Sequence, residues 1–343
     1  MTFLPLRIGL LAVSLLLLSL GQALTAGPSS PACSSDGKTG LLLAGIEVVR
    51  EQHQGGWEKN DAACKLLAWY RAQPMVASVS MRESCLTVRF TDGSSAVLMN
   101  IMDSLDEERQ DPISVVPTVR LAGSGLTSLV LNPDQYAYGA RSCREIMRIL
   151  SRCGFSNTYE ANSDVTLDLV RRNLTADVVV FNTHAGYWDI DGDGVADSVV
   201  IATGEPWTNQ TTEQYAFDCQ QGFIVEGVVG ARAFIAFTPG FIQYYYNDSF
   251  PGSLVYMATC ESAADDSMAN AFLAEGAGAY VGWTSSTTSW TNRFTSVLAF
   301  RLLAHHLPVS AVCGLIRSGG LCNRWFHSIL TYFGNGDYRL PRT

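Results

Sequence analysis

Short apolar runs alternate with stretches of helical periodicity from about residue 125 onward, and this alternating pattern is the strongest constraint on the fold. The apolar runs are Leu126–Leu131, a short one near Thr158, Asp177–Phe181, Ser253–Thr259 and Ala279–Trp283. The helical stretches lie near residues 139–152, 164–173, 265–275, 290–304 and 308–317. Strands that are apolar along their length are typical of a largely parallel sheet covered by helices on both faces. The alternating pattern therefore predicts an α/β fold with functional groups at the carboxyl ends of its strands.

The segment that precedes this α/β region has a different pattern. Residues 27–40 predict a loop, and residues 41 to about 102 have short, β-leaning patterns. Asp92-Gly93 stands between two alternating runs and predicts a hairpin. A polar stretch from 103 to 111, with prolines just after it, predicts a linker. We therefore expect a small β-rich N-terminal domain with its linker at residues 27–119, and the main domain at residues 120–343.

The first 26 residues have the order of charge and hydropathy of a secretory signal peptide. Arg7 precedes the uncharged, leucine-rich run Ile8–Leu20, and mostly small residues follow as far as Ala26. This run is shorter than the roughly 20 residues that a membrane span needs. We expect cleavage after Ala23 or Ala26, which predicts a secreted or extracytoplasmic protein that meets a membrane only through this signal; an uncleaved anchor is the alternative.

Composition excludes several classes of protein. The chain is 47% hydrophobic and 16% charged, which is typical of a globular protein rather than a disordered one. Its net charge is −9, and no basic stripe follows the sequence, so we expect no nucleic-acid partner. We also expect no organic cofactor, and the sequence specifies no oligomeric state.

Nine cysteines follow the predicted cleavage site. In an oxidising compartment most of them are expected to form disulfides, and an odd number leaves at least one outside such pairs. Cys313 and Cys322 flank a Gly-Gly turn and are the simplest local pair. Cys143 and Cys153 are not expected to pair, because a helix between them would separate them by about 15 Å, more than a disulfide spans.

A histidine and a cysteine follow two of the predicted strands. His184 comes shortly after the strand at 177–181, and Cys260 comes shortly after the strand at 254–258. A thiolate nucleophile needs a nearby base and N–H donors for the oxyanion that develops on its substrate. The pattern predicts Cys260 as the nucleophile, His184 as the base, and backbone N–H groups near Gly186 and Cys260 as the oxyanion hole. The structural alternatives are a disulfide-bonded or inert thiol and a strand-end histidine with a purely structural role.

These segments resemble the clan CD cysteine peptidases, and most closely their gingipain-like and caspase-like branch. The matching segments are Val178–Gly186, Leu254–Ser262 and Gly276–Trp283, within a region of roughly residues 120–305. The resemblance implies a caspase-haemoglobinase-like three-layer sandwich with a mostly parallel sheet, and peptide hydrolysis by a Cys260/His184 dyad. Two features depart from the family pattern. Ala185 stands where the family usually has glycine, which makes its N–H the oxyanion donor, and the long His-to-Cys spacing predicts an insertion at about 187–250.

The predicted insertion begins with the pattern of a calcium-binding loop. Its predicted ligands at positions 1, 3, 5, 7 and 9, with glycine at position 6, are Asp189, Asp191, Asp193, Val195 and Asp197. Position 12 is Val200 rather than glutamate, so the usual closing ligand is missing. We expect a calcium ion that stiffens the active-site rim; the alternative is an acidic turn without a metal.

Two further acids are candidates for substrate binding. Glu205 and Asp218 lie in the predicted insertion and are candidates to bind a basic side chain that precedes the scissile bond; a surface role is the alternative. The sequence as a whole predicts a secreted cysteine endopeptidase with a peptide or protein substrate. The rival hypothesis is a catalytically weak caspase-like scaffold that binds peptides or a protein partner. A serine hydrolase is disfavoured because the chain has no Gly-x-Ser-x-Gly motif.

Overall fold

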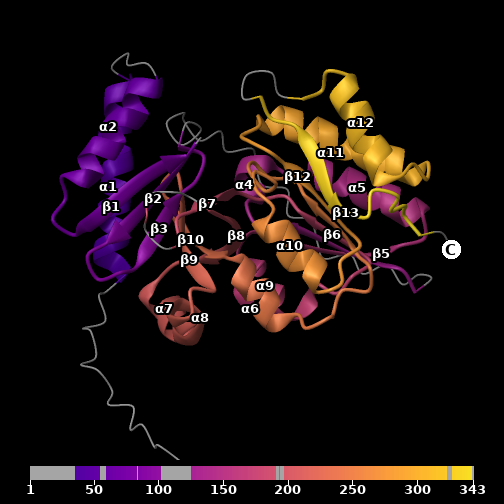
Figure 1. Ribbon diagram of the computed structural model, residues 1–343, viewed down its shortest axis with the longest axis horizontal. Helices are drawn as coiled ribbons and strands as arrows, with labels where there is room; N and C mark the ends of the chain where they lie inside the picture. Colours follow the sequence, from indigo (N-terminus) through magenta and orange to yellow (C-terminus); the bar gives the residue numbers. More distant parts are fainter. Residues whose placement is uncertain are drawn as a thin grey trace, which may run out of the picture. The chain divides into compact units, whose positions relative to one another are not determined.

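The fold was analysed in a computed structural model, which describes residues 35–54, 59–82, 84–101, 125–190, 193, 197–322 and 327–341. The described strands form one six-stranded and one seven-stranded sheet, with helices packed around them (Figure 1). The predicted α/β class is therefore confirmed. The predicted signal peptide and nearly all of the predicted linker lie outside the described residues.

Five strands of the six-stranded sheet are those that the apolar runs predict, and the sixth, at residues 330–334, was not predicted. Its order is β13-β12-β11-β6-β4-β5, and all neighbours are parallel except β13, which pairs antiparallel with β12. The strands are β4 (Thr127–Asn132), β5 (Ser156–Ala161), β6 (Val178–Phe181), β11 (Leu254–Met257), β12 (Ala279–Trp283) and β13 (Leu330–Gly334). Every residue of β6 and β11 is buried, which explains their uninterrupted apolar sequences.

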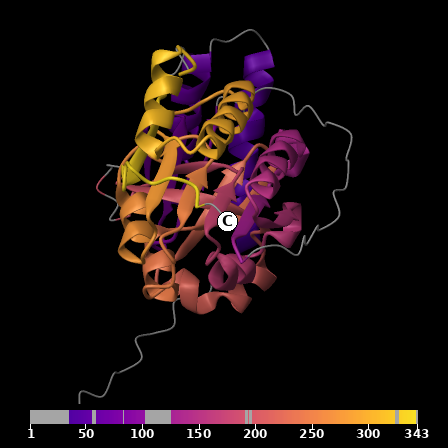
Figure 2. The same ribbon diagram turned by 90° about the vertical axis from the view of Figure 1, so that its right-hand side faces the viewer.

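Helices cover both faces of this sheet (Figure 2). On one face lie α5 (Arg141–Arg152), α11 (Ser289–Ala304) and α12 (Val309–Ser318). On the other lie α6 (Leu167–Asn173), α9 (Pro239–Tyr245) and α10 (Ser267–Ala274). Successive strand residues point to opposite faces of the sheet. Val178 and Val180 therefore pack in the core beneath α5, α11 and α12, whereas Val179 and Phe181 pack in the core beneath α6, α9 and α10.

The seven-stranded sheet combines the N-terminal strands with the predicted insertion. Its order is β1-β2-β3-β9-β10-β8-β7. The strands are β1 (Val76–Arg82), β2 (Cys85–Phe90), β3 (Ser95–Leu98), β7 (Ala185–Trp188), β8 (Ser198–Pro206), β9 (Ile224–Val229) and β10 (Arg232–Phe237). The hairpin predicted at Asp92-Gly93 joins β2 to β3, and β3 pairs in parallel with β9. The two segments that the sequence assigns to different domains thus share one sheet.

The loop at 27–40 and the β-leaning pattern at 41–71 were wrong where the structure describes them. Residues Ser35–Gln54 form α1, and Lys59–Arg71 form α2. Glycine is a poor helix former, and α1 contains three of them, which disguises the helix in the sequence. One of them, Gly45, makes room for a neighbour: a Cβ there would lie 2.6 Å from the ring of Tyr70. Tertiary packing therefore outweighs local propensity in α1.

The seven-stranded sheet curls so that β7 packs against β2 and β3. Thr87 Oγ1 donates a hydrogen bond to the carbonyl of Tyr187 at 3.2 Å, and Gly186 lies directly against the side chains of Met99 and Cys85. The curl encloses a small core, formed by Val97, Met99, Val200, Ala202, Val225, Val229, Phe234 and Ala236. We call this curled sheet the half-barrel. The start of β7 and the end of β3 lie at one of its ends, and the start of β8 and the β2–β3 turn lie at the other.

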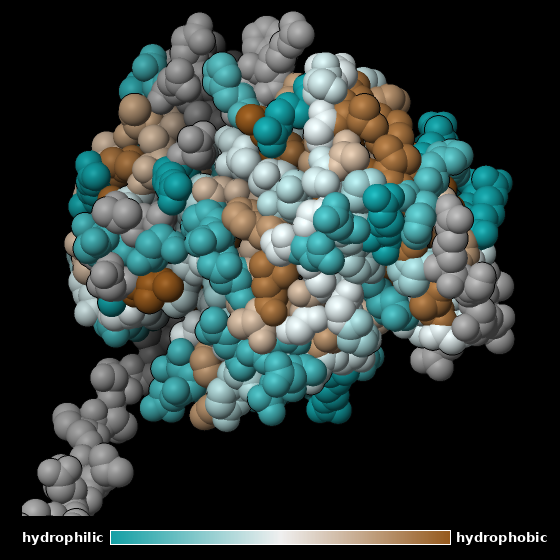
Figure 3. All heavy atoms as spheres, turned by 45° about the vertical axis from the view of Figure 1, so that its right-hand side comes forward, coloured by the Kyte–Doolittle hydropathy of each residue, from teal (hydrophilic) through white to brown (hydrophobic). Residues whose placement is uncertain are grey.

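The surface has no single dominating apolar area on the face shown in Figure 3, where apolar side chains lie in separate patches among polar ones. Short helices α4 (Gln135–Tyr138), α7 (Asn209–Gln214) and α8 (Ala216–Gln220) complete the described structure, with one 3-10 turn at Asn162–Asp164. Within the described residues, no helix has the length and apolar character needed to cross a membrane.

Candidate active site

Three neighbouring parallel strands are each followed, after the same number of residues, by a residue with a chemically reactive side chain. Leu131 of β4 pairs with Phe181 of β6, which pairs in turn with Met257 of β11. Asp134 follows β4, His184 follows β6 and Cys260 follows β11, in each case three residues after the paired position. Neighbouring strands lie about 4.8 Å apart. The prediction that the strands before His184 and Cys260 meet at one sheet edge is confirmed, and Asp134 joins them there.

His184 is held at both ring nitrogens. Nε2 lies 2.9 Å from Oδ2 of Asp134, and Nδ1 lies 2.9 Å from the Tyr138 hydroxyl and 2.7 Å from Nδ2 of Asn100. Only 6% of the residue is exposed. An Nε2–H that donates to the carboxylate leaves Nδ1 as the basic nitrogen of the neutral ring, which is the arrangement a general base needs.

Asp134 is a buried carboxylate with two cationic or potentially cationic neighbours. Besides His184, the guanidinium of Arg232 lies 2.8 Å from its Oδ1. Burial by itself raises the pKa of Asp134, but the hydrogen bond and charge of His184 and the charge of Arg232 outweigh it and hold the pKa below its usual value. The group is therefore an anion at neutral pH, able to stabilise a protonated His184.

Cys260 is a buried thiol rather than a disulfide half. None of the eight described cysteines is in a disulfide, and this includes the predicted pair Cys313 and Cys322. Cys260 is 5% exposed, and its sulfur accepts a hydrogen bond from the N–H of Thr287 at 3.2 Å. The thiol can return a bond to the Thr287 carbonyl at 3.4 Å. The loop that follows β12 therefore holds the sulfur in place.

The two oxyanion candidates have different backbone roles in β7. The N–H of Ala202 donates to the carbonyl of His184, and Ala185 and Gly186 lie opposite Ile201 and Val200. In an antiparallel pair the hydrogen-bonded positions alternate. The ladder to β8 therefore uses the N–H of Gly186, whereas the N–H of Ala185 points away from β8. Of the two, Ala185 is the residue whose N–H the β7–β8 ladder leaves unused, and neither residue has a positive φ.

Gly186 instead allows close packing of β7 against neighbouring side chains, and a substitution tests this role. An added Cβ would lie 2.9 Å from Met99 Cγ and 3.1 Å from Cys85 Sγ, inside the curl of the half-barrel. We expect Gly186→Ala to lower the free energy of unfolding by about 1–3 kcal/mol. Urea denaturation measures this, with Gly314→Ala as the control, because that helical glycine has open space around it. Equal or greater stability of Gly186→Ala would contradict the packing role.

The two predicted substrate-binding acids are engaged inside the fold. Glu205 accepts a hydrogen bond from the N–H of Leu167 at 2.8 Å, at the start of α6, and lies 3.2 Å from the Tyr215 hydroxyl. Asp218 forms a buried ion pair with Arg171 at 2.6 Å and accepts a hydrogen bond from Tyr245 at 2.7 Å. Both carboxylates thus stabilise the packing of the insertion against α6, and Asp218 also joins α8 to α9 within the insertion.

The predicted calcium loop is described only in part. Asp191 and Val195 lie outside the described residues. Asp189 is buried and accepts a 3.4 Å hydrogen bond from Ser80, and Asp197 accepts one from the N–H of Ile190 at 3.3 Å. Among the described residues, including Asp193, no three acidic, cysteine or histidine side chains converge on a possible metal position. The described ligands alone do not form a calcium site, so no chemical step is assigned to the metal.

The N-terminal region contributes residues that the sequence did not indicate. Asn100, which follows β3 with φ 51°, reaches His184 as described above. Ser84, in the turn between β1 and β2, donates to the carboxyl group of Glu261 at 2.6 Å, and Cys85 and Ser286 donate at 2.7 and 2.8 Å. Glu261 is fully buried directly after Cys260, and burial raises its pKa. The N-terminal strands therefore support both the histidine and the cysteine loops.

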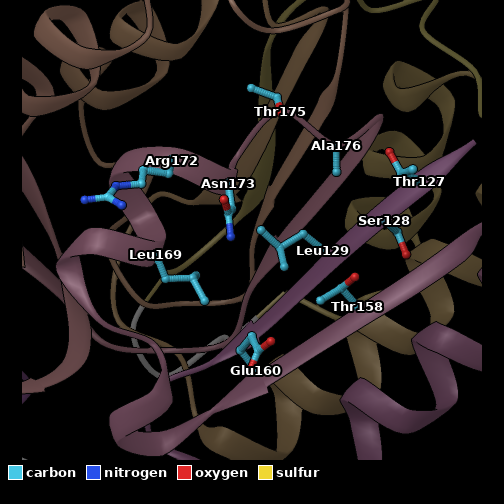
Figure 4. A pocket seen from close by; sticks show the side chains of 10 residues that line it. All are labelled: Thr127, Ser128, Leu129, Thr158, Glu160, Leu169, Arg172, Asn173, Thr175 and Ala176. Carbon is cyan, nitrogen blue, oxygen red and sulfur yellow. The ribbon is translucent and has the colours of Figure 1, made fainter. Parts of the chain in front are cut away.

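A separate small cavity lies elsewhere in the six-stranded sheet (Figure 4). Its volume is about 310 Å³, and it lies beside the first residues of β4, next to β5 and α6. Thr127, Thr158 and Asn173 are among its lining residues. Because it borders the amino end of β4, it is away from the strand ends that carry Asp134 and His184, and no nucleophilic thiol lines it.

Comparison with known proteins adds no assignment for this site. No protein-family model matches the chain, and no curated protein shows significant sequence similarity to it. The strand-end geometry and the local motifs at Val178–Gly186 and Leu254–Ser262 therefore carry the functional inference.

Proposed function

We propose that the protein is a secreted cysteine endopeptidase with a caspase-haemoglobinase-like core. The observation that carries the proposal is the matched position of Cys260, His184 and Asp134 at the ends of three adjacent parallel strands. A nucleophile, a base and a carboxylate that orients the base are the parts that nucleophilic hydrolysis of an amide requires. The sheet covered by helices on both faces supports the proposed fold.

The proposed reaction proceeds through a thioester. The thiol proton of Cys260 moves to Nδ1 of His184, and the sulfur forms a bond to the carbonyl carbon of the scissile peptide. The carbonyl oxygen becomes an oxyanion, which accepts a hydrogen bond from the N–H of Ala185. The carbon–nitrogen bond then breaks, and the proton on Nδ1 goes to the leaving amine. Water hydrolyses the thioester with His184 again as base, and this releases the acid and restores the thiol.

The rival function, a peptide-binding scaffold with little or no turnover, has one observation in its favour. His184 Nδ1 is hydrogen-bonded to Tyr138 and Asn100, and the Cys260 sulfur accepts a hydrogen bond from Thr287. The two reactive atoms are therefore hydrogen-bonded to these neighbours and not to each other. Proton transfer requires that Nδ1 exchange these partners for the sulfur. Catalytic hydrogen bonds often form only when substrate is bound, so this arrangement is compatible with either function.

Selective alkylation of the folded protein separates the two functions. At pH 6 an ordinary thiol is less than about 1% thiolate, so only an activated cysteine reacts quickly. We expect iodoacetamide to label Cys260 at least about ten times faster than exposed Cys64, as measured by peptide mapping over time. His184→Ala should abolish this advantage, and buried Cys143, whose pKa burial raises to about 12, is the unreactive reference.

The scaffold function has its own signature in the same experiment. Labelling of Cys260 as slow as that of Cys143, in a protein with an unchanged melting temperature, would reject the endopeptidase. Fast labelling together with peptide hydrolysis that is absent in Cys260→Ala would reject the scaffold.

Calcium is included in the proposal only as a stabiliser of the loop at 189–197. At a calcium concentration about a hundred times the dissociation constant, bound ion adds about 3 kcal/mol to the free energy of unfolding. We therefore expect calcium to raise the melting temperature, a chelator to reverse the rise, and Asp193→Asn to remove it. Asp337→Asn, an exposed aspartate outside the loop, is the matched control. A chelator that changes neither melting temperature nor turnover would show that the loop is an acidic turn.

A further inference from the structure

A large cavity lies at the end of the half-barrel opposite His184. Its volume is about 800 Å³, within the range of ligand-binding pockets, and barrel mouths are common places for them. The ends of β2 and β7 and the starts of β8 and β9 border it, and its walls include Arg89, Trp188, Ser198, Trp207 and Phe223. His184 precedes β7 and Trp188 ends it, so about 13 Å of strand separates the cavity from the candidate active site.

Three hydrogen-bonding groups of this wall have no partner in the described structure. They are Nη1 of Arg89, Nε1 of Trp188 and Oγ of Ser198, and each of these atoms is buried. Ser198 is only 1% exposed, so bulk water does not satisfy it. Buried polar groups in folded proteins nearly always have partners. These three side chains line the same cavity, so a group bound there can supply the missing partners.

The charge and chemistry of the wall indicate the class of ligand. Arg89 is half-buried, and no carboxylate among the described residues forms an ion pair with it. Asp197 also borders the cavity, where its Oδ1 accepts a hydrogen bond from the N–H of Ile190, and it forms no ion pair with Arg89. All three orphans can donate a hydrogen bond, so the missing partner is an acceptor, and a guanidinium favours an anionic one. The rings of Trp207 and Phe223 offer apolar surface beside them.

We propose that this cavity binds an acidic peptide segment. A carboxylate would pair with the guanidinium of Arg89, which is half-buried, and side-chain rotations at Trp188 and Ser198 would turn their buried donors toward it. A neighbouring apolar side chain would pack against Trp207 and Phe223. A neutral sugar would use the aromatic rings but would leave the guanidinium without an anion. Only one part of this inference rests on the proposed function: in an endopeptidase, the cavity would hold a segment of the substrate remote from the scissile bond.

Calorimetric titration of the full chain tests the site with defined probes. The protein carries Cys260→Ala so that no probe is hydrolysed, and the probes are acetyl-Phe-Glu-Phe-amide and its neutral counterpart acetyl-Phe-Gln-Phe-amide. We expect the glutamate peptide to bind, and Arg89→Gln to weaken it by about tenfold or more, because the variant removes a charge-assisted hydrogen bond. Arg317→Gln, an exposed arginine on α12, is the matched control and should bind as before. Ser198→Ala should weaken binding less than Arg89→Gln does.

Several outcomes would overturn the proposal. These are equal affinity for the two peptides, unchanged affinity in a folded Arg89→Gln variant, or no binding at all by the folded protein. Binding of N-acetylglucosamine that Arg89→Gln leaves intact, without binding of the glutamate peptide, would overturn the ligand class. The two proposals fail separately: if alkylation shows Cys260 to be inert while the peptide still binds, the endopeptidase falls and this site stands.

Discussion

Asp134→Asn will lower the peptide turnover of the proposed endopeptidase by roughly two to four orders of magnitude while the chain remains folded. The substitution keeps the shape of the side chain but removes the negative charge that stabilises a protonated His184. It also allows the amide to donate to Nε2, and this places the ring proton on Nδ1, the nitrogen that must accept the thiol proton. The measurement is kcat with a peptide substrate, together with the rate of Cys260 alkylation.

Asp337→Asn is the matched control, because that aspartate is exposed and remote in sequence from the three strand ends. Both variants should keep the cooperative melting of the wild type. Asp134→Asn with wild-type turnover would show that the carboxylate serves the fold and not the reaction. A parallel loss of turnover and alkylation rate would assign Asp134 as a residue that positions His184.

The free energy of unfolding will fall as the pH rises from about 4.5 to about 7, because of one buried acid in β9. Burial raises the pKa of Glu226 from 4.5 to about 7, although the Thr39 hydroxyl at 2.5 Å and the charge of Lys38 oppose the rise. In this pH window the folded chain keeps the proton that the unfolded chain has released. Raising the pH therefore favours unfolding, by up to about 3 kcal/mol over the window, and the effect is constant above it.

Glu226→Gln isolates this effect, since glutamine cannot titrate but can still accept the hydrogen bond from Thr39. We expect the variant to be more stable than the wild type at pH 8, and to lose the decline between pH 4.5 and 7, as measured by urea denaturation at several pH values. Glu213→Gln is the control, because Glu213 is exposed. A wild-type pH slope in Glu226→Gln would assign the dependence to other groups.

The inner strands β6, β11 and β12 were predictable because they are buried on both faces, and their sequences are therefore apolar without interruption. The edge strand β13 is mostly half-buried, and it was not predicted from the sequence. The same rule that selected His184 and Cys260 applies to Asp134, which follows β4 in an Asn-Pro-Asp segment. The position of Asp134 just after a predicted strand would therefore have been enough to select it as a candidate site residue. Asn100 had no comparable signal, because it meets His184 only through the pairing of β3 with a strand much later in the chain.

Other predictions failed for physical reasons that a single sequence does not reveal. The glycines of α1 lower its helix propensity, and only the fit of Gly45 against Tyr70 shows why a helix forms there. Glu205 resembles a surface acid in sequence, yet it is buried against the start of α6. In each case a residue distant in the sequence decides the role.

The pairing of β3 with β9 also has a consequence for synthesis of the chain. Ala96 lies opposite Glu226, so β3 meets its parallel partner only after the ribosome has added 130 further residues. At about 5–20 residues per second, this takes roughly 6–26 seconds. During that time the edge of β3 that will pair with β9 is open, and such edges can pair with other chains. Folding of the N-terminal region is therefore tied to the completion of the half-barrel and is not an independent early event.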